Sequence, residues 1–286
     1  MIKLIASDMD GTLVASDHHI SKENAAAIKH AQGKGVEFII STGRSFEDAR
    51  GQVEEAGISC NYLVMNGSEL RNHQGEVIRK HYLDNSIVSE IVTDLLARDL
   101  FVEVYSTGGT FALGTTEACK WAIAAKIHNF YPDNAVADLV LTVEEHFLYK
   151  ELNRISDVQQ VFNQGHEVGK IICFNHDTNL IAGLREEIPL KYTVNATGSF
   201  AINLEITNPL ADKGNAIKNY ALSKGIDLED VMTIGDSFND MTMIDAPFGY
   251  TVAMGNAIDE IKSVARYITD TNDQHGVGNI INKILK

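Results

Sequence analysis

The stretch IKLIASDMDGTL, residues 2–13, sets the fold and the candidate site of this chain. Its apolar half is typical of a buried β-strand, and it ends at two carboxylates, Asp8 and Asp10. In an extended chain, residues i and i+2 point to the same side, so both carboxylates are expected to face one small volume. Such a pair repels itself and either shares a proton or binds a cation, and a cation site that also admits a phosphate is a familiar solution.

The next two residues fit an anion-binding turn. Gly11 lets the chain turn sharply, and the Thr12 hydroxyl with nearby backbone N–H groups can face an anion. From these residues alone, a polar turn that closes a strand is the alternative interpretation.

Composition narrows the class of protein. The chain has 286 residues, 44% hydrophobic and 22% charged, which is ordinary globular composition with room for one large or two moderate domains. Its formal net charge of −15 argues against nucleic acid and anionic membranes as partners. No apolar run approaches the roughly 20 residues that span a bilayer, and the first run reaches Asp8 too soon for a secretion signal. A cytoplasmic location is the default expectation.

The two ends of the chain follow the pattern of a parallel sheet. Apolar strands are predicted over residues 36–40 and 62–65, and amphipathic helices over 21–35 and 45–56. Alternation of this kind indicates a doubly wound parallel sheet with helices on both faces.

The C-terminal quarter repeats the pattern with a helix over residues 213–224 and strands over 231–234, 250–254 and 266–269. A polar cluster follows each strand. Ligands of open parallel sheets bind beyond the carboxyl ends of the strands, so residues 8, 42, 213 and 236 are expected to form one site.

The middle of the chain has a different order. Its predicted helices cover residues 87–99, 116–129 and 144–162, and its predicted strands cover 101–106, 110–113, 170–174, 191–196 and 200–207. Consecutive strands favour antiparallel pairing in a separate α+β domain. We therefore predict a core domain of residues 1–82 and 209–286 with an inserted domain of residues 83–208, joined by two crossings that make a natural hinge.

Four segments of the core now resemble the ordered motifs of the haloacid dehalogenase superfamily. They are Asp8-Met9-Asp10-Gly11-Thr12, Ser41-Thr42-Gly43-Arg44, Asp212-Lys213-Gly214 and Gly235-Asp236-Ser237-Phe238-Asn239-Asp240. The insertion after Asn66-Gly67 and the segment Met254-Gly255-Asn256-Ala257 look like the Cof-type branch, class IIB, whose large α/β cap is inserted in the core and whose members are mostly small-molecule phosphatases.

The resemblance implies roles for four catalytic residues. Asp8 becomes the nucleophile, Asp10 the general acid and base, Thr42 a phosphate donor, and Lys213 the cation that offsets charge on the nucleophile and the phosphoryl group.

It also implies a magnesium site and a phosphate site. The metal ligands are Asp8, the backbone carbonyl of Asp10 and Asp236, with Asp240 in support. The implied substrate contacts are Gly11, Thr12, Gly43, Arg44, Asn66 and Asn239. One departure concerns Gln274-His275, which stand where relatives commonly carry an acidic pair, so no role is carried over to that loop.

Each residue also has an ordinary structural interpretation. Lys213 can be a solvated helix lysine, and Thr42 can cap a helix. Asp236 and Asp240 can be cap and first-turn acids of the helix that follows them. Arg44 can pair with a surface carboxylate such as Glu47.

The sequence thus predicts a Mg²⁺-dependent phosphatase that hydrolyses a small phosphorylated metabolite, a sugar phosphate or a related phosphomonoester, through an aspartyl phosphate. Two alternatives stay open at this point. One is a phosphomutase of the same superfamily, and the other is a sensor that binds phosphosugars without turnover.

Overall fold

In the computed structural model, which describes residues 1–130 and 134–285, the apolar segment before Asp8 forms β1 (Leu4–Ser7), and all of its residues are buried. It belongs to an eight-stranded sheet. The other strands of this sheet are β2 (Glu37–Ser41), β3 (Asn61–Val64), β4 (Glu69–Arg71), β5 (Val77–Lys80), β11 (Val231–Gly235), β12 (Tyr250–Ala253) and β13 (Tyr267–Ile268). Their order is β13-β12-β11-β1-β2-β3-β4-β5.

The sheet is parallel from β13 to β3, and β4 and β5 extend it as an antiparallel hairpin. The parallel strands are the apolar runs that the sequence analysis identified, because strands covered on both faces have few polar positions. The predicted α/β fold class with a parallel sheet is therefore confirmed. The β4–β5 hairpin was not predicted, since its strands are short and β5 is mostly exposed.

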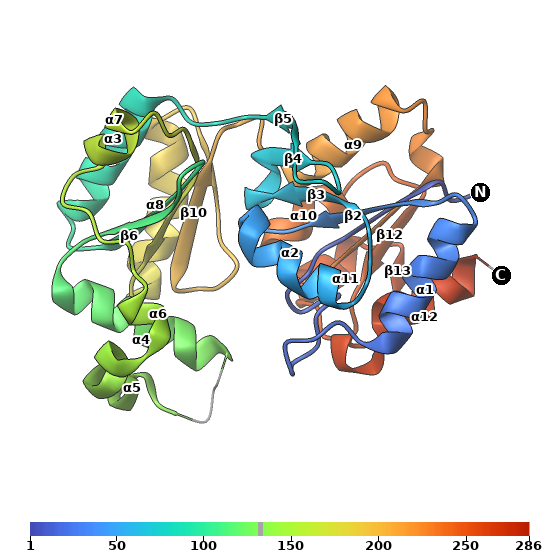
Figure 1. Cartoon of the computed structure of the whole chain (residues 1–286), viewed down its shortest axis with the longest axis horizontal. Helices are drawn as coiled ribbons and strands as arrows, with labels where there is room; N and C mark the ends of the chain where they lie inside the picture. The colour runs from blue at the N-terminus through green and yellow to red at the C-terminus, as the bar shows by residue number, and fades with distance from the viewer. Residues whose placement is uncertain (131–133, 286) are drawn as a thin grey trace. The chain divides into compact units, whose positions relative to one another are not determined.

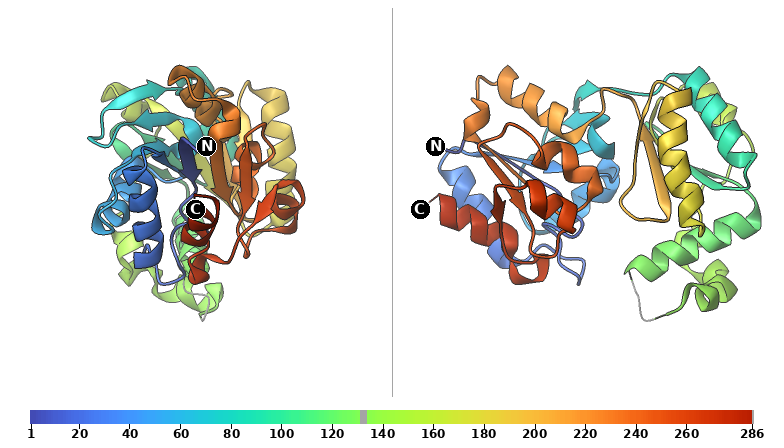
Figure 2. Two further views of the ribbon diagram at one scale, coloured as in Figure 1. Left: turned by 90° about the vertical axis from the view of Figure 1, so that its right-hand side faces the viewer. Right: turned by 180° about the vertical axis from the view of Figure 1, so that it is seen from behind.

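Helices cover both faces of this sheet. They are α1 (Lys22–Gly33), α2 (Phe46–Glu55), α9 (Lys213–Ser223), α10 (Met241–Ile244), α11 (Asp259–Val264) and α12 (Gly276–Ile284). Strand order runs in opposite directions from β1 in the two halves of the chain, so right-handed crossovers place their helices on opposite faces. Figure 2 shows α1 and α12 side by side, where the buried Asn24 side chain accepts a hydrogen bond from the backbone N–H of Gly278.

Contacts divide the chain into two units (Figure 1). The core unit comprises Met1–His81 and Pro209–Lys286 and contains the eight-stranded sheet. The inserted unit comprises Tyr82–Asn208 and has a sheet of its own. The chain thus leaves the core unit after β5 and returns before α9.

The inserted unit is built on a five-stranded antiparallel sheet, β7-β6-β8-β10-β9. Its strands are β6 (Phe101–Ser106), β7 (Gly109–Leu113), β8 (Val168–Phe174), β9 (Asn195–Thr197) and β10 (Asn203–Thr207). Its helices are α3 (Asn85–Leu96), α4 (Thr116–Phe130), α5 (Val136–Thr142), α6 (Phe147–Lys150), α7 (Gln159–Asn163) and α8 (Thr178–Lys191). One apolar cluster joins α3 and α8 to the sheet, and a second joins α4 to it.

Three predicted elements of this unit have different bounds or a different type in the structure. The strand over 191–196 is instead the end of α8 followed by the short β9, because burial of Ile181, Leu184 and Ile188 holds a helix that contains Pro189. The helix over 144–162 is broken, since residues 153 and 155 hydrogen bond to Ala112 of β7. The strand over 200–207 begins only at Asn203.

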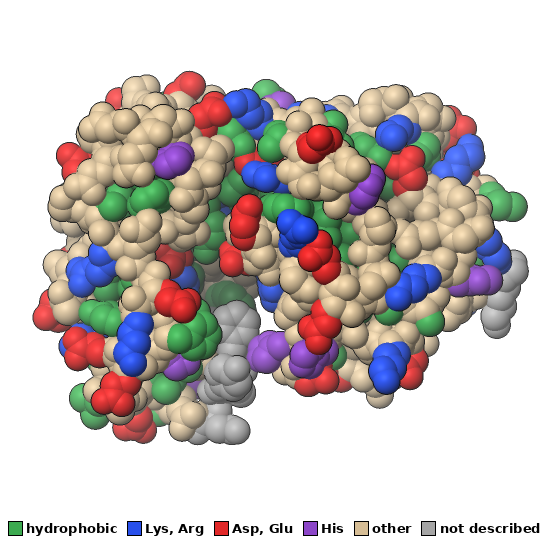
Figure 3. Space-filling model, in the orientation of Figure 1, with side chains coloured by type: hydrophobic (Ala, Val, Ile, Leu, Met, Phe, Trp, Pro, Cys, Tyr) green, Lys and Arg blue, Asp and Glu red, His purple; other side chains and the backbone are tan. Residues whose placement is uncertain are grey.

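The length of the helices and the distribution of surface charge concern the partners that the protein can have. Within the described residues, no helix combines the length and the hydrophobicity that crossing a bilayer requires. On the face drawn in Figure 3, basic side chains lie singly among acidic ones.

The Asn24 side chain provides a test of how α1 and α12 are joined. Its amide also donates to the carbonyl of Leu13, 3.3 Å away, so Asn24→Ala leaves buried partners unsatisfied. We expect the free energy of unfolding to fall by about 1–3 kcal/mol, measured by urea unfolding. Asn215, also the third residue of its helix but exposed, is the matched control, and an equal loss in Asn215→Ala would contradict the account.

Candidate active site

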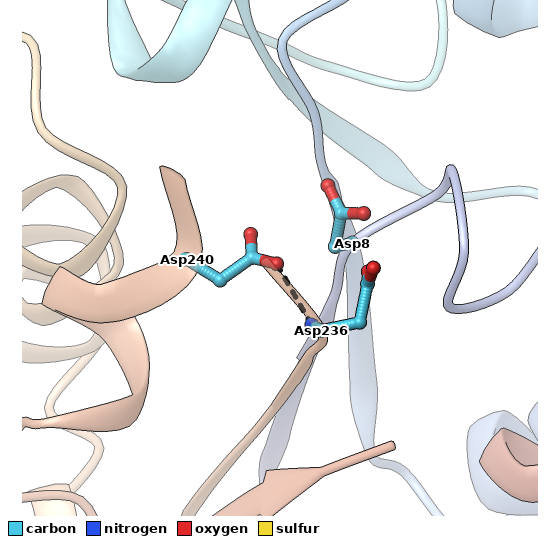
Figure 4. Close-up of side chains that lie close together, drawn as sticks. All are labelled: Asp8, Asp236 and Asp240. Atoms are coloured by element: carbon cyan, nitrogen blue, oxygen red, sulfur yellow. Dashed lines mark hydrogen bonds between the residues drawn. The ribbon is translucent and has the colours of Figure 1, made fainter. Parts of the chain in front are cut away.

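Parallel pairing brings two distant aspartates together at one edge of the core sheet. Ser7 of β1 pairs with Ile234 of β11, so Asp8 and Asp236 both follow the carboxyl ends of neighbouring strands. Asp240 reaches the same place from a short 3-10 turn after β11. Carboxylate oxygens of these three residues lie within 4.8 Å of one another (Figure 4). Asp8 is 4% exposed and Asp240 is fully buried.

Lys213 links two of these carboxylates. Its Nζ atom donates to Oδ1 of Asp8 at 2.7 Å and to Oδ1 of Asp240 at 2.6 Å. Lys213 is the first residue of α9 and is 1% exposed, so the solvated interpretation of this lysine is wrong. The carboxylates Asp240 and Asp8 raise the pKa of Lys213 although burial lowers it, and the side chain is therefore a fixed positive charge.

Asp240 has a structural task as well. Its second oxygen, Oδ2, accepts hydrogen bonds from the backbone N–H groups of Asp236 and Ser237 at 2.9 and 3.1 Å. The arrangement is a capping box, in line with the first-turn interpretation of this acid. Because it holds the backbone of Asp236 and the ammonium of Lys213 at once, Asp240 positions both.

The turn after β1 supports Asp236. The Thr12 hydroxyl donates to Oδ1 of Asp236 at 2.7 Å, so in this structure its partner is a carboxylate of the protein. Gly11 has a φ of +75°, and a Cβ atom there would lie 2.5 Å from Oδ2 of Asp236. Glycine is therefore required at position 11 both by its backbone conformation and by the closeness of Asp236.

Burial dominates the protonation of the site. It raises the pKa of Asp8 well above the ordinary range, with Asp240 adding to the effect and Lys213 opposing it. Burial, with Asp240 adding repulsion, raises the pKa of Asp236 to about 7. Ionisation of both carboxylates is unfavourable when they lie side by side in a buried place. A bound cation therefore stabilises their ionised forms strongly.

The residues present fit a divalent cation. Three carboxylates and one ammonium leave a formal charge of −2 at this place when all are ionised. Lys213 occupies only one oxygen of Asp8, which leaves the other oxygen for a ligand. Oxygen ligands from carboxylates are those that Mg²⁺ prefers.

Asp10 is paired with Arg44 in this structure and still acts electrostatically on Asp8, whose pKa it helps to raise. Its carboxylate is half-exposed and accepts two hydrogen bonds from Arg44, Nε to Oδ2 at 2.8 Å and Nη2 to Oδ1 at 2.6 Å. Strand β1 ends at Ser7 and a turn begins at Met9, so Asp10 lies beyond the extended segment from which the i, i+2 expectation was drawn. The same pair replaces the suggested contact of Arg44 with Glu47.

Thr42 and Asn66 lie together after β2 and β3. Thr42 is 1% exposed, and its carbonyl accepts from the backbone N–H of Asn66 at 3.0 Å. The Ser45 side chain caps α2, so the helix-cap interpretation of Thr42 is wrong. Asn66 has a left-handed backbone, with φ 57°. Gly43, predicted to contact substrate, lies between Thr42 and Arg44 in the loop that ends β2.

Asn239, the other predicted phosphate contact, accepts a hydrogen bond from the Ser237 hydroxyl at 2.7 Å. The structure thus places it within the short turn that carries Asp240.

Three supporting residues were missed by the sequence reasoning. A Cβ atom at Gly214 would lie 1.9 Å from the carbonyl oxygen of Thr242, so only glycine lets α9 begin close enough to bring Lys213 to Asp240. A Cβ atom at Gly235 would lie 2.7 Å from the Asp240 side chain. Asn256 donates to the carbonyl of Gly11 at 2.7 Å. All three stand inside quoted motifs, but no pattern indicated their contacts.

The atypical loop at Gln274-His275 supports the turn after β1 from outside. Asp273 accepts from the backbone and hydroxyl of Ser16, at 2.8 and 2.9 Å, and Asn272 donates to the carbonyl of Val14. His275, with φ 60°, is the N-cap residue that precedes α12. Its Nε2 lies 3.8 Å from a Glu23 oxygen.

Comparison with known proteins gives consistent matches over the whole chain. The family model described as haloacid dehalogenase-like hydrolase matches residues 5–281. Phosphatase YwpJ of Bacillus subtilis is 30% identical, over 99% of this chain and all of its own. The 5-amino-6-(5-phospho-D-ribitylamino)uracil phosphatase YwtE of the same organism is also 30% identical, over 99% and 98% of the two chains.

Among solved structures, a haloacid dehalogenase-like hydrolase from B. subtilis matches with a TM-score of 0.85 at 28% identity, over 98% of this chain and 99% of that one. The motifs quoted from the sequence and the full-length family match agree. The chain belongs to the haloacid dehalogenase superfamily, in its Cof-type branch, and is a phosphatase of that family.

Proposed function

We propose that this phosphatase uses Mg²⁺ to hydrolyse a small phosphorylated metabolite through a phosphoryl group carried on Asp8. The observation that carries the proposal is the buried Lys213 ammonium, 2.7 Å from Asp8 and 2.6 Å from Asp240, beside the carboxylate of Asp236. Hydrolysis of phosphate monoesters is among the slowest uncatalysed reactions, so the site must stabilise the transition state by upwards of roughly 20 kcal/mol.

Charge at the site is central to the mechanism. Asp8 and Asp236 would hold the ion with Asp240 and the Asp10 carbonyl in support, and the bound ion would offset the negative charge of the phosphoryl oxygens. Lys213 supplies a second positive charge on the opposite oxygen of Asp8. Since Lys213 is buried and paired twice, it stays in place during the reaction without reorganising.

Asp8 is the nucleophile of the proposed reaction. Its Oδ1 accepts a hydrogen bond from Lys213, which orients the carboxylate for attack on phosphorus. In the first displacement the bond from phosphorus to the ester oxygen breaks as the bond to Asp8 forms. In the second displacement water attacks the same phosphorus and the bond from phosphorus to Asp8 breaks. Phosphate is released, and the free Asp8 carboxylate is regenerated.

Asp10 is the proposed proton donor to the departing oxygen and the later base toward water. Its carboxylate is paired with Arg44 here and is half-exposed, so the reaction requires it to exchange this partner for the leaving group. Thr42 and the backbone around Gly43 and Asn66 are the proposed contacts of the phosphate.

We infer the substrate class from one of the relatives. One relative named above is a phosphatase of a phosphorylated ribitylaminouracil, which supports small sugar-derived phosphates as the class. We assign leaving-group selection to the inserted unit, as a cap domain. A cytoplasmic location and the lack of a nucleic-acid partner stay predictions that rest on the sequence.

The metal site predicts a pH-dependent stability. A pKa of about 7 for Asp236, above its ordinary value of 3.8, means that the folded protein binds this proton more tightly than the unfolded chain does. In EDTA, the free energy of unfolding should therefore fall as pH rises from about 4 to about 7. Saturating Mg²⁺ should remove this decline, so the rise in Tm on adding Mg²⁺ should grow with pH, as measured by thermal unfolding.

The control for the metal prediction is Asp245→Asn, which removes an exposed carboxylate one helical turn beyond Asp240. We expect it to keep the full Mg²⁺ effect, whereas Asp236→Asn should lose most of it. A variant lacking Asp236 that still shows the normal increase in Tm would contradict the metal site.

The assignment of Asp8 and Asp10 predicts a kinetic signature. The substrate for this test is p-nitrophenyl phosphate, because its leaving group, p-nitrophenol, needs little protonation. Asp10→Asn should therefore still transfer the phosphoryl group to Asp8, but it should hydrolyse the resulting aspartyl phosphate slowly. Stopped-flow measurements should show a burst of about one p-nitrophenol per enzyme followed by turnover slower by about 10²-fold or more.

Asp8→Asn is the companion variant, and it should give neither burst nor turnover while keeping its fold by circular dichroism. A burst from Asp8→Asn, or rapid steady turnover from Asp10→Asn, would refute the assigned roles.

A further inference from the structure

A pocket lies in the core unit at the other end of the sheet from Asp8. It has a volume of about 480 Å³, within the range of small-molecule sites. Its walls include Asn61, Leu70, Ile78, Arg79, Tyr220 and Lys224. Asn61 begins β3, and Tyr220 stands near the end of α9, whose first residue is Lys213. The pocket is therefore near the amino ends of the parallel strands, whereas Asp8 follows a carboxyl end.

Arg79 is the distinctive group of this pocket. Its Nη2 donates to the carbonyl oxygen of Ala216 at 3.1 Å, which fixes the guanidinium against α9. Among the described residues, no carboxylate forms an ion pair with Arg79, and burial lowers its pKa. A guanidinium presents five donors in a planar fork that matches a carboxylate, so most of its binding capacity here is unused.

The remaining charges of the pocket sum to near zero. Lys224 also lines the pocket, and its Nζ is 3.8 Å from Oε1 of Glu37. The other Glu37 oxygen accepts from the Tyr220 hydroxyl, which in turn accepts from the Asn61 amide at 2.8 Å. Lys224 and Glu37 offset each other, which leaves the single positive charge of Arg79. A ligand with one negative charge balances it better than a dianionic phosphate does.

The apolar wall indicates the body of such a ligand. Leu70 is buried, whereas Ile78 is 52% exposed on the terminal strand β5. A short apolar chain laid along these two side chains would remove the exposed face of Ile78 from water.

We propose that this pocket binds a small organic monocarboxylate, with the carboxylate on Arg79 and the apolar body along Leu70 and Ile78. The site is independent of the catalytic group, because none of its lining residues belongs to the machinery assigned above.

Hexanoate is the probe, and acetate and 1-hexanol are its matched comparisons. Ligand-observed NMR in EDTA without substrate gives each dissociation constant, so the result does not depend on turnover. We expect hexanoate to bind several-fold more tightly than acetate, since apolar area adds affinity, and more tightly than 1-hexanol, which lacks the charge.

Arg79→Gln should raise the dissociation constant of hexanoate by about tenfold or more, as expected for loss of a charged hydrogen-bonding partner. Arg266→Gln is the matched control, because Arg266 also donates to one backbone carbonyl, that of Gly249 at 3.2 Å, outside the pocket. Asp8→Asn is a second control, because it would alter the binding of hexanoate if hexanoate bound at the catalytic site. Both controls should change the dissociation constant by less than about twofold.

Ile78→Ser supplies a second test that does not depend on the charge. It should remove the preference for hexanoate over acetate while leaving acetate binding unchanged. Undetectable binding of hexanoate to the wild type, equal binding by Arg79→Gln, or loss of binding in Asp8→Asn would each overturn the proposal.

Discussion

The structure of the site depends on one buried ammonium held between two carboxylates. Burying a charge is costly unless it is paired, and Lys213 is paired with Asp8 and Asp240 at hydrogen-bonding distances. Neither acid can be removed without leaving a buried positive charge less than fully compensated. Since Asp240 also holds the backbone of Asp236, the same lysine ties three segments of the chain into one arrangement.

The fold supplies the closeness that this arrangement needs. Parallel register between β1 and β11 sets Asp8 and Asp236 at neighbouring strand ends, although more than two hundred residues separate them. Helix α9 reaches the same edge only because Gly214 lets it approach the carbonyl of Thr242. The spacing of the motifs along the chain is thus a consequence of where strands end and where a helix can begin.

The sequence alone was sufficient to predict the parallel sheet and the cluster of acidic residues at its edge. Apolar runs that alternate with amphipathic helices carry that information, and the rule for strand ends converts it into a site. It was not sufficient for the partners of individual side chains. The pairing of Asp10 with Arg44 and of Thr12 with Asp236 depends on how a turn is folded in three dimensions. Helix α8 was missed because its buried face outweighs the local preference against Pro189.

The central claim is that Asp8 carries the phosphoryl group during turnover. Acid quenching of the wild-type enzyme during hydrolysis, followed by proteolysis and mass spectrometry, tests it most directly. The account predicts the added mass of one phosphoryl group on the peptide that contains Asp8, absent when substrate is omitted. Continued phosphate release with that peptide unmodified, or with the phosphoryl group on a different residue, would contradict it.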